Sequence, residues 1–277
     1  GGGADEDSSS GSARRRAGSV VRASPAAPSE GHLALDRIFS SSALLDAEAV
    51  VDFVVRLCAV SAEELLHPVS PRIFSLQKIV EVAYYNMSRI RLVWARIWGV
   101  LGAHFTAVGC HPHLGVGMYA VDSLRQLANT FLERDEHANY AFQSAFLRPF
   151  ERVMHAHPSS RMRELVLSCV RHVSQSRATR VRSGWRVIFG VLAAAAADEE
   201  AAIVDLGWAV CAECVAVGGH LASVCEGAAF LDAVACVRAF VAQDRSERAS
   251  AAAVVALGQD IGEQVSAGAL PAVVAAA

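Results

Sequence analysis

Residues 143–176 read QSAFLRPFERVMHAHPSSRMRELVLSCVRHVSQS. Apolar residues recur there at intervals of three and four on both sides of HPSS (157–160), a pattern typical of two amphipathic helices joined by a turn. The same succession of two helices returns twice further along, first in 182–196 with 199–217 and then in 229–243 with 246–261. The chain is therefore expected to be built from successive helical pairs.

The helical pattern extends over most of the chain. Further helices are expected at 90–108 and 115–133, and no alternating run of strand type occurs between residues 35 and 265. The pairs return about every 40–47 residues, which is the length of a HEAT or armadillo unit. A single pair cannot bury its apolar face, so neighbouring pairs should stack around a continuous core. The sequence predicts an all-α fold, a HEAT/armadillo-like α-solenoid of antiparallel helix pairs.

The two ends of the chain differ from this pattern. Residues 1–31 hold Gly, Ser, Ala, Pro and charged residues without apolar periodicity, so we expect a disordered linker there. Within it, RRRAGS (14–19) places arginines before Ser19 as basophilic kinases prefer, although an ordinary charged linker is the simpler interpretation. Residues 32–250 form the expected repeat region, and the Ala-rich residues 251–277 specify little structure. The first residue is Gly rather than Met, which suggests a fragment of a longer protein.

Composition restricts the class of function. The 277 residues carry a formal net charge of −3, whereas nucleic-acid binding favours a basic bias. The cysteines are odd in number and scattered, as in proteins of a reducing compartment. Residues 1–19 lack the apolar centre of a signal peptide. The most apolar stretch, 206–225, carries Glu213 and His220, which favours a buried helix over a membrane span. We expect a soluble, cytoplasmic chain that binds no nucleic acid and whose membrane contact is peripheral.

Two cysteine motifs leave an alternative open, a metal site or an enzyme. CAEC (211–214) would place two thiols about one helical turn apart, and CHPHLG (110–115) places His111 and His113 beside Cys110. A structural zinc site needs four ligands, and no second motif is placed to complete either set. Motifs of the G-x-x-x-x-G-K-[ST], G-x-G-x-x-G and G-x-S-x-G types do not occur. The sequence therefore predicts no enzyme activity, cofactor, metal or small-molecule substrate.

Residues 75–98, SLQKIVEVAYYNMSRIRLVWARIW, gather four of the chain's Trp and Tyr residues. We expect two helices here, with their junction near residues 86–88 and with Ser75 capping the first. Side chains offset by three and four share a helix face. The large side chains with this offset, most of which should pack between helical layers, are Tyr84, Trp94, Ile97 and Trp98.

The same stretch concentrates positive charge, since it holds Arg89, Arg91 and Arg96 and no acid beyond Glu81. Arg89 and Arg96 are seven residues apart and should share one helix face. A face without acids could bind an acidic surface of a small GTPase or an anionic lipid, and it could equally be a solvated face over an aromatic core. The candidate partner-binding residues, which include a second pair four residues apart, are Arg89, Arg91, Arg96, Arg148 and Arg152.

FSLQKIVEVAYYNMSRIRLVWARIW (74–98) resembles the helical region downstream of the exchange domain in large Golgi Arf guanine-nucleotide exchange factors, the brefeldin A-inhibited BIG/Sec-seven family. The resemblance covers about residues 35–192 and fades after about residue 200. Its other segments are 35–66, 120–136, 142–154 and 182–189. The exchange domain of this family inserts a glutamate-bearing loop into the nucleotide site of Arf. The present residues hold no counterpart of that loop, so no catalytic residue is carried over.

The resemblance implies a non-catalytic segment that regulates or recruits an exchange factor. It also implies contacts with small GTPases of the Arf or Rab type, a role in vesicle transport, and a location peripheral to Golgi or trans-Golgi membranes. The repeat pattern alone leaves a rival open, a general HEAT-type scaffold whose concave groove holds a peptide or an adaptor. Peptide binding that does not depend on nucleotide would favour the rival.

Overall fold

The structure is a computed structural model that describes residues 30–67, 70–133, 141–216 and 228–266. The chain divides into two compact units, residues 1–37 and 38–277. All regular secondary structure among the described residues is helical, which confirms the all-α prediction. The elements in chain order are α1 (Glu30–Ser40), the 3-10 helix η1 (Ser41–Leu44), α2 (Ala47–Leu65), α3 (Phe74–Asn86), α4 (Arg91–Gly109), α5 (Leu114–Phe131), α6 (Phe142–Ala156), α7 (Ser160–Arg177), α8 (Gly184–Ala196), α9 (Ala201–Ala216), α11 (Ala228–Ala242) and α12 (Glu247–Ser266).

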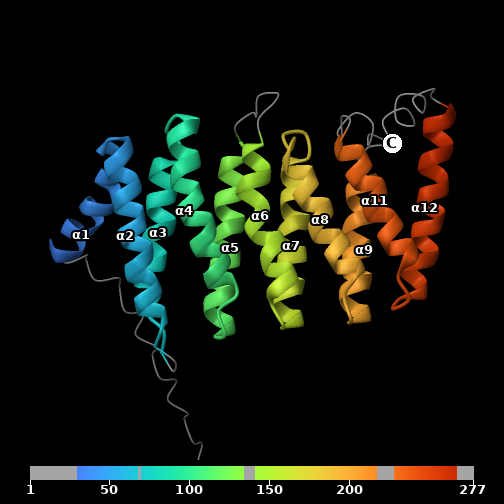
Figure 1. The fold of residues 1–277 in the computed structure, drawn as a ribbon, viewed down its shortest axis with the longest axis horizontal. Coiled ribbons are helices and arrows are strands. Elements are labelled where there is room, and N and C mark those ends of the chain that lie inside the picture. The colour runs from blue at the N-terminus through green and yellow to red at the C-terminus, as the bar shows by residue number, and fades with distance from the viewer. Residues whose placement is uncertain (1–29, 68–69, 134–140, 217–227, 267–277) are drawn as a thin grey trace, which may run out of the picture. The chain divides into compact units, whose positions relative to one another are not determined.

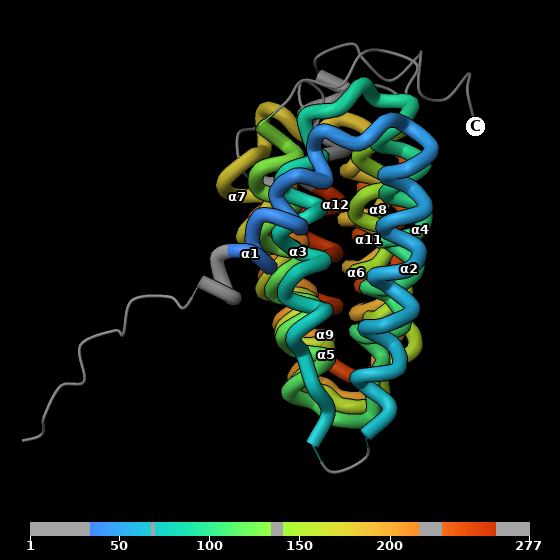
Figure 2. Tube along the Cα trace, turned by 90° about the vertical axis from the view of Figure 1, so that its left-hand side faces the viewer, coloured from blue at the N-terminus to red at the C-terminus, as the bar shows by residue number. Residues whose placement is uncertain are grey.

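Within the unit 38–277 the helices form two layers. Helices α2, α4, α6, α8 and α11 pack one on the next in the first layer, and α3, α5, α7, α9 and α12 do so in the second. Figure 2 shows the two layers from the side. Helices that follow one another along the chain, such as α4 and α5 or α6 and α7, also pack together across the layers. Each helix therefore buries one side against its layer neighbours and another against the opposite layer.

The start of α2 is fixed by the side chain of Asp46. Its Oδ1 accepts hydrogen bonds from the backbone N–H groups of Glu48 and Ala49, at 3.0 and 2.8 Å. A helix start leaves such N–H groups without intrahelical partners, and an Asp at this position satisfies them. Glu48 adds a negative charge to the first turn, where the helix dipole favours it.

The start of α3 differs from the prediction. Helix α3 begins at Phe74 with Ile73 at the capping position, so the expectation that Ser75 caps this helix is wrong. The backbone N–H of Ser75 instead donates to Glu64 Oε2 at 2.9 Å. A carboxylate from the end of the preceding helix thus takes over the capping role, which local sequence spacing could not reveal.

The aromatic residues of α4 lie in the core. The prediction of two helices meeting near 86–88 is confirmed by the ends of α3 and α4. Trp94, Ile97 and Trp98 are 3%, 0% and 5% exposed, as the spacing predicts. Tyr84 is 59% exposed and is the exception, so the prediction that most of these four side chains are buried is confirmed. The buried stripe of α3 runs through Leu76, Ile79 and Ala83, and the periodicity of α4 does not continue back through the turn to Tyr84.

Stacked rings join α4 to its neighbours in both layers. Trp98 lies against Phe146 of α6 with ring centroids 3.9 Å apart, and Phe131 of α5 stacks on Phe146 at 4.4 Å. Trp94 stacks on both Trp98 and Phe131, at 5.8 and 6.3 Å. Large rings of this kind dominate the energetics of a core. The cluster therefore fixes the approach of α4 to α6.

Helix α9 covers the first half of the apolar stretch 206–225, and residues 217–225 lie outside the described residues. None of the described helices is both long and apolar enough to cross a bilayer. Most of the predicted linker 1–31 and the end of the chain, 267–277, also lie outside the described residues. Helix α12 crosses the predicted boundary at residue 250 and continues to Ser266.

Candidate functional site

Arg89 lies in the turn before α4 and is used inside the molecule. Its Nε donates to Asn86 Oδ1 at 2.6 Å, and its Nη2 donates to the carbonyl oxygens of Ser42, Ala43 and Leu45 at 3.0, 3.1 and 2.6 Å. The guanidinium thus ties the turn after α3 to the segment before α2. Because Arg89 precedes the helix, the expectation that it shares a helix face with Arg96 is wrong.

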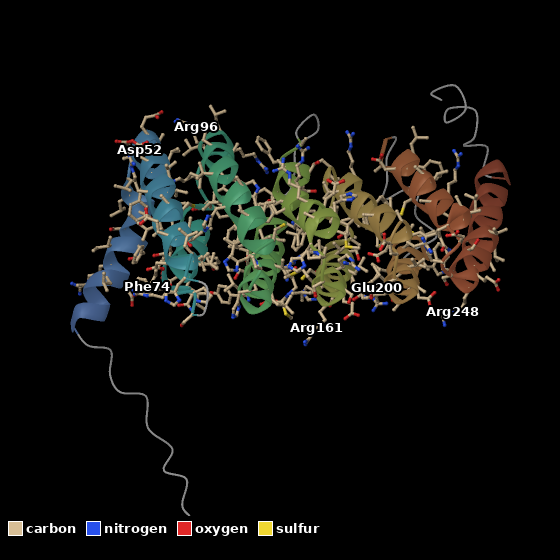
Figure 3. The ribbon with its side chains drawn as sticks, turned by 60° about the horizontal axis from the view of Figure 1, so that its bottom comes forward. Asp52, Phe74, Arg96, Arg161, Glu200 and Arg248 are labelled. Carbon is tan, nitrogen blue, oxygen red and sulfur yellow. The ribbon has the colours of Figure 1, made fainter. Side chains whose placement is uncertain are left out.

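Arg96 forms a two-pronged ion pair with Glu48 of α2. Its Nη1 and Nη2 donate to the two carboxylate oxygens at 2.6 and 2.7 Å. The hydrogen bond and charge of Arg96 lower the pKa of Glu48 below its ordinary value. Figure 3 shows Arg96 and Asp52, the latter on the neighbouring α2, at the same end of their helices. The expected acid-free face is therefore wrong at Arg96, because the acids come from a helix distant in sequence.

Arg91 begins α4 and lies beside the first residue of α6. The centre of its guanidinium is 5.6 Å from the centroid of the Phe142 ring. A cation in this position is attracted by the electron-rich ring face. Arg91 therefore extends the positive charge of α4 to the start of α6.

Arg148 and Arg152 are exposed on α6, one helical turn apart. Among the described residues, neither guanidinium has a hydrogen-bond or ion-pair partner. Arg89 and Arg96 hold neighbouring elements together, whereas this pair presents its charge to the surroundings. Of the predicted arginines, Arg148 and Arg152 are the two that line a common pocket.

The pocket lies between α4 and α6 and has a volume of about 200 Å³. Its inner wall is aromatic, and small residues of α4 leave its mouth open. A side chain added at Gly99 would meet no atom within 4 Å of its Cβ. The residues that line the pocket are Trp94, Ala95, Trp98, Gly99, Gly102, Ala103, Thr106, Phe131, Phe142, Ala145, Arg148, Pro149 and Arg152.

Pro149 shapes the α6 wall of this pocket. A proline inside a helix has no N–H to donate to the carbonyl four residues earlier, which here belongs to Ala145. The indole Nε1 of Trp98 donates to that carbonyl oxygen at 3.1 Å. Trp98 of α4 thus supplies the hydrogen bond that the Ala145 carbonyl lacks within α6. The same bond holds the indole in place at the inner wall of the pocket.

Among the described residues that line the pocket, the charged side chains are of one sign. Helices α4 and α8, which flank α6 in the same layer, contain no Asp or Glu. The acid of α6 is Glu151, and its carboxylate lies so close to Gly190 of α8 that an added Cβ would collide with it. Glu151 therefore belongs to the α6–α8 interface, and no acid in the described part of the chain is paired with either arginine.

The geometry suits a macromolecular contact better than a small-molecule site. Pockets for small ligands and cofactors measure about 300–1,000 Å³ and enclose most of the ligand. The present pocket is smaller and open at Gly99, and arginines are the ionisable residues among its lining groups. A recess of this size has room for one side chain.

The cysteine and histidine motifs lie elsewhere. Cys211 Sγ and Cys236 Sγ are 3.8 Å apart in the core, and burial raises the pKa of the Cys214 thiol to about 12. His111 Nε2 lies 3.2 Å from the carbonyl oxygen of Leu65, and the backbone N–H of His113 donates to His111 Nδ1. Across the part of the chain that the structure describes, no three His, Cys, Asp or Glu side chains are grouped as metal ligands would be.

A family model and individual known proteins both match the chain. A family model described as Mon2/Sec7/BIG1-like, HDS, matches residues 130–213. Brefeldin A-inhibited guanine nucleotide-exchange protein 1 of Homo sapiens is 49% identical over 210 residues, which are 75% of this chain and 11% of the relative. The protein of the same name from Arabidopsis thaliana is 45% identical over 210 residues, which are 76% of this chain and 12% of the relative.

The chain belongs to the brefeldin A-inhibited exchange-protein family. It spans about a ninth of the length of these relatives. The region matched by the family model runs from the end of α5 into α9, so the α6 wall of the pocket, with Arg148 and Arg152, lies inside it. The α6 wall of the candidate pocket is thus built from residues that the HDS family model matches.

The pocket itself was missed by sequence reasoning. Signals for it were present in Gly99, which leaves open space on α4, in Gly102, whose missing Cβ gives the Trp98 indole room, and in Pro149, which interrupts the hydrogen bonding of α6. Each of these residues has an ordinary interpretation when it is read alone. Only the packing of α4 against α6 shows that these residues together form a pocket.

Proposed function

We propose that the chain is a non-catalytic regulatory and recruitment segment of a guanine-nucleotide exchange factor that acts on Arf GTPases in Golgi vesicle transport. Its relatives are named as guanine nucleotide-exchange proteins, and its matched region carries the description HDS. It would work through contacts with small GTPases of the Arf or Rab type and through peripheral contact with Golgi membranes.

The architecture proposed for this role is a HEAT/armadillo-like α-solenoid over residues 32–250. The two-layer packing supports it, because each helix contacts its pair partner and the next helix of its own layer. Stacked helical pairs of this kind expose extended surfaces to partners.

The observation that carries the proposal is the unpaired charge of Arg148 and Arg152 beside the α4–α6 pocket. Two exposed arginines without an acidic neighbour favour a partner with an acidic surface, since charge complementarity raises association rates and selects partners. We assign direct contact to these two residues and an adjoining position to Arg91. Arg89 and Arg96 would act by holding α2, α3 and α4 in register.

A pull-down of GTP-loaded and GDP-loaded Arf and Rab proteins by the purified chain tests this proposal. We expect one GTPase to bind in a nucleotide-dependent way, and we expect the double variant Arg148→Glu/Arg152→Glu to lose that binding. Arg56→Glu/Arg238→Glu is a matched control, because both residues are exposed on the same layer but away from the pocket. The proposed contact would be refuted if none of these GTPases bound to the chain. It would also be refuted if the two double variants bound a GTPase equally well.

The second candidate function is a scaffold that holds a peptide or an adaptor. The α4–α6 pocket favours it, because the pocket has the size of a side chain and opens to the surface. This candidate predicts binding that is the same in the presence of GTP and of GDP. The pull-down therefore separates the two functions by their nucleotide dependence.

A further inference from the structure

We infer that the α4–α6 pocket receives one large apolar side chain from an acidic segment of a protein partner. The inference rests on the partner-binding role proposed for Arg148 and Arg152, but it does not require the partner to be a GTPase. It assigns two parts to the site, an aromatic recess and a basic rim.

The recess is formed by buried rings and by small residues of α4. Trp94, Trp98 and Phe131 provide apolar surface at its base, and these three side chains are 3%, 5% and 6% exposed. Gly99 at the mouth adds no side chain, so an incoming group can reach the base. An aromatic side chain buries about 150–250 Å² when enclosed, which makes it an effective anchor. A volume of about 200 Å³ accommodates one such anchor.

The basic rim selects what surrounds the anchor. Arg148 and Arg152 lie one turn apart on α6, and both line the pocket. Hydrogen bonds between a guanidinium and a carboxylate are shorter and stronger than those between neutral groups. Glu151 is held against α8, and α4 and α8 carry no acid, so the described helices around the pocket offer these arginines no carboxylate and an acidic occupant would complement them. The complementary segment therefore carries Asp or Glu beside its apolar residue.

The recess argues for a protein segment over an anionic membrane. Membrane attraction by basic residues amounts to about 1 kcal/mol for each Lys or Arg near the surface, and recognition uses clusters of about 4–8 of them. The pocket has two arginines at its rim, with Arg91 next to Phe142 at one end. Its apolar part would contribute nothing to binding lipid headgroups. A central apolar anchor ringed by polar contacts is instead the usual anatomy of a protein–protein hot spot.

Gly99→Leu tests the recess without damaging the fold. The new side chain points into open space at the mouth of the pocket, so it should block an anchor. Replacing a glycine inside a helix by leucine also favours the helix. Gly258→Leu is the matched control, because Gly258 is likewise exposed in a helix and an added Cβ there meets nothing within 4 Å.

The experiment selects short random peptides displayed on phage against the whole chain, followed by fluorescence-polarisation titrations of the enriched peptides. We expect enrichment of peptides with one Phe, Trp, Leu or Ile next to Asp or Glu. Gly99→Leu and Arg148→Glu/Arg152→Glu should each raise the Kd at least about tenfold, which is the loss expected of an anchor residue. Gly258→Leu should leave the Kd unchanged.

Several results would overturn the inference. They are peptides without acidic bias, no enrichment over a blank surface, or peptides whose Kd is the same for wild type and Gly99→Leu. Vesicles containing phosphatidylserine form a separate arm, and arginine-dependent binding to them without peptide binding would assign the surface to lipid. If a GTPase binds in a nucleotide-dependent way and Gly99→Leu leaves that binding intact, the inference about the pocket is refuted but the proposed function is not. If acidic peptides bind as expected but no GTPase binds, the proposed function is refuted but the inference about the pocket is not.

Discussion

Trp98 and Ala145 are joined across the two helices by a hydrogen bond that a proline makes possible. The indole Nε1 of Trp98 donates to the Ala145 carbonyl oxygen at 3.1 Å, in the place that a backbone N–H at position 149 would take in a regular helix. The contact couples the inner wall of the pocket to the backbone of α6. It also gives a direct way to test how α4 and α6 are held together.

Trp98→Phe should destabilise the chain more when Pro149 is present than when it is replaced. In wild type, the substitution removes the donor to Ala145, at a net cost of about 1 kcal/mol in addition to lost packing. In the Pro149→Ala background, the alanine N–H can serve that carbonyl, so the cost of Trp98→Phe should be smaller. Urea unfolding of the four proteins in this cycle measures the difference. Equal costs in the two backgrounds would show that the hydrogen bond contributes nothing.

Arg89 and Arg96 should differ in their contribution to stability. Arg89→Met leaves three carbonyl oxygens and Asn86 Oδ1 without their charged donor, and we expect a loss of about 1.5–3 kcal/mol. Arg96→Met breaks an exposed ion pair, and such pairs contribute little in water. The urea midpoint should therefore fall for Arg89→Met and barely move for Arg96→Met. A larger fall for Arg96→Met would contradict the assignment of Arg89 as the internal link.

The sequence predicted the helices and much of the core, but not the arginine environments. Residues such as Trp94 and Trp98 follow a helical period, and burial of an apolar stripe depends mainly on that period. The partner of Arg96, Glu48, lies 48 residues earlier, and an ion pair between helices leaves no local trace. The hydrogen bond from the start of α3 to Glu64 of α2 was missed for the same reason. The pocket depends on the approach of α4 to α6, which no single helix encodes.

Lower pH should destabilise the chain through His104. Burial lowers the pKa of this histidine from 6.5 to about 4, while its Nε2 lies 3.1 Å from Ser61 Oγ. The unfolded chain therefore binds more protons than the folded chain between these values, and stability falls as the pH drops from about 6.5 to about 4. His157, whose pKa is also lowered by burial, acts in the same direction.

His104→Gln isolates the contribution of His104 to this pH dependence. Glutamine does not titrate and can still reach the Ser61 hydroxyl. Urea midpoints at several pH values between 4 and 6.5 should decline less steeply for His104→Gln than for wild type. Parallel declines would show that His104 is not desolvated in the folded chain.

Two glycines should respond to alanine in opposite directions. A Cβ at Gly207 would lie 2.6 Å from the Cβ of Ala195, so Gly207→Ala should force α8 and α9 apart at a cost of about 1–3 kcal/mol. A Cβ at Gly258 meets nothing within 4 Å, and Gly258→Ala should stabilise α12 by about 0.5–1 kcal/mol. Urea midpoints of both variants check the signs. A stabilising Gly207→Ala would contradict the close packing of α8 on α9.

Nucleotide release from Arf tests the regulatory role most directly. An exchange domain of this family would be compared alone, joined to the wild-type chain, and joined to the chain carrying Arg148→Glu/Arg152→Glu. We predict that the wild-type chain changes the release rate by about fivefold or more, a typical coupling between sites, and that the double variant returns the rate toward that of the domain alone. The same rate from all three proteins would contradict the account.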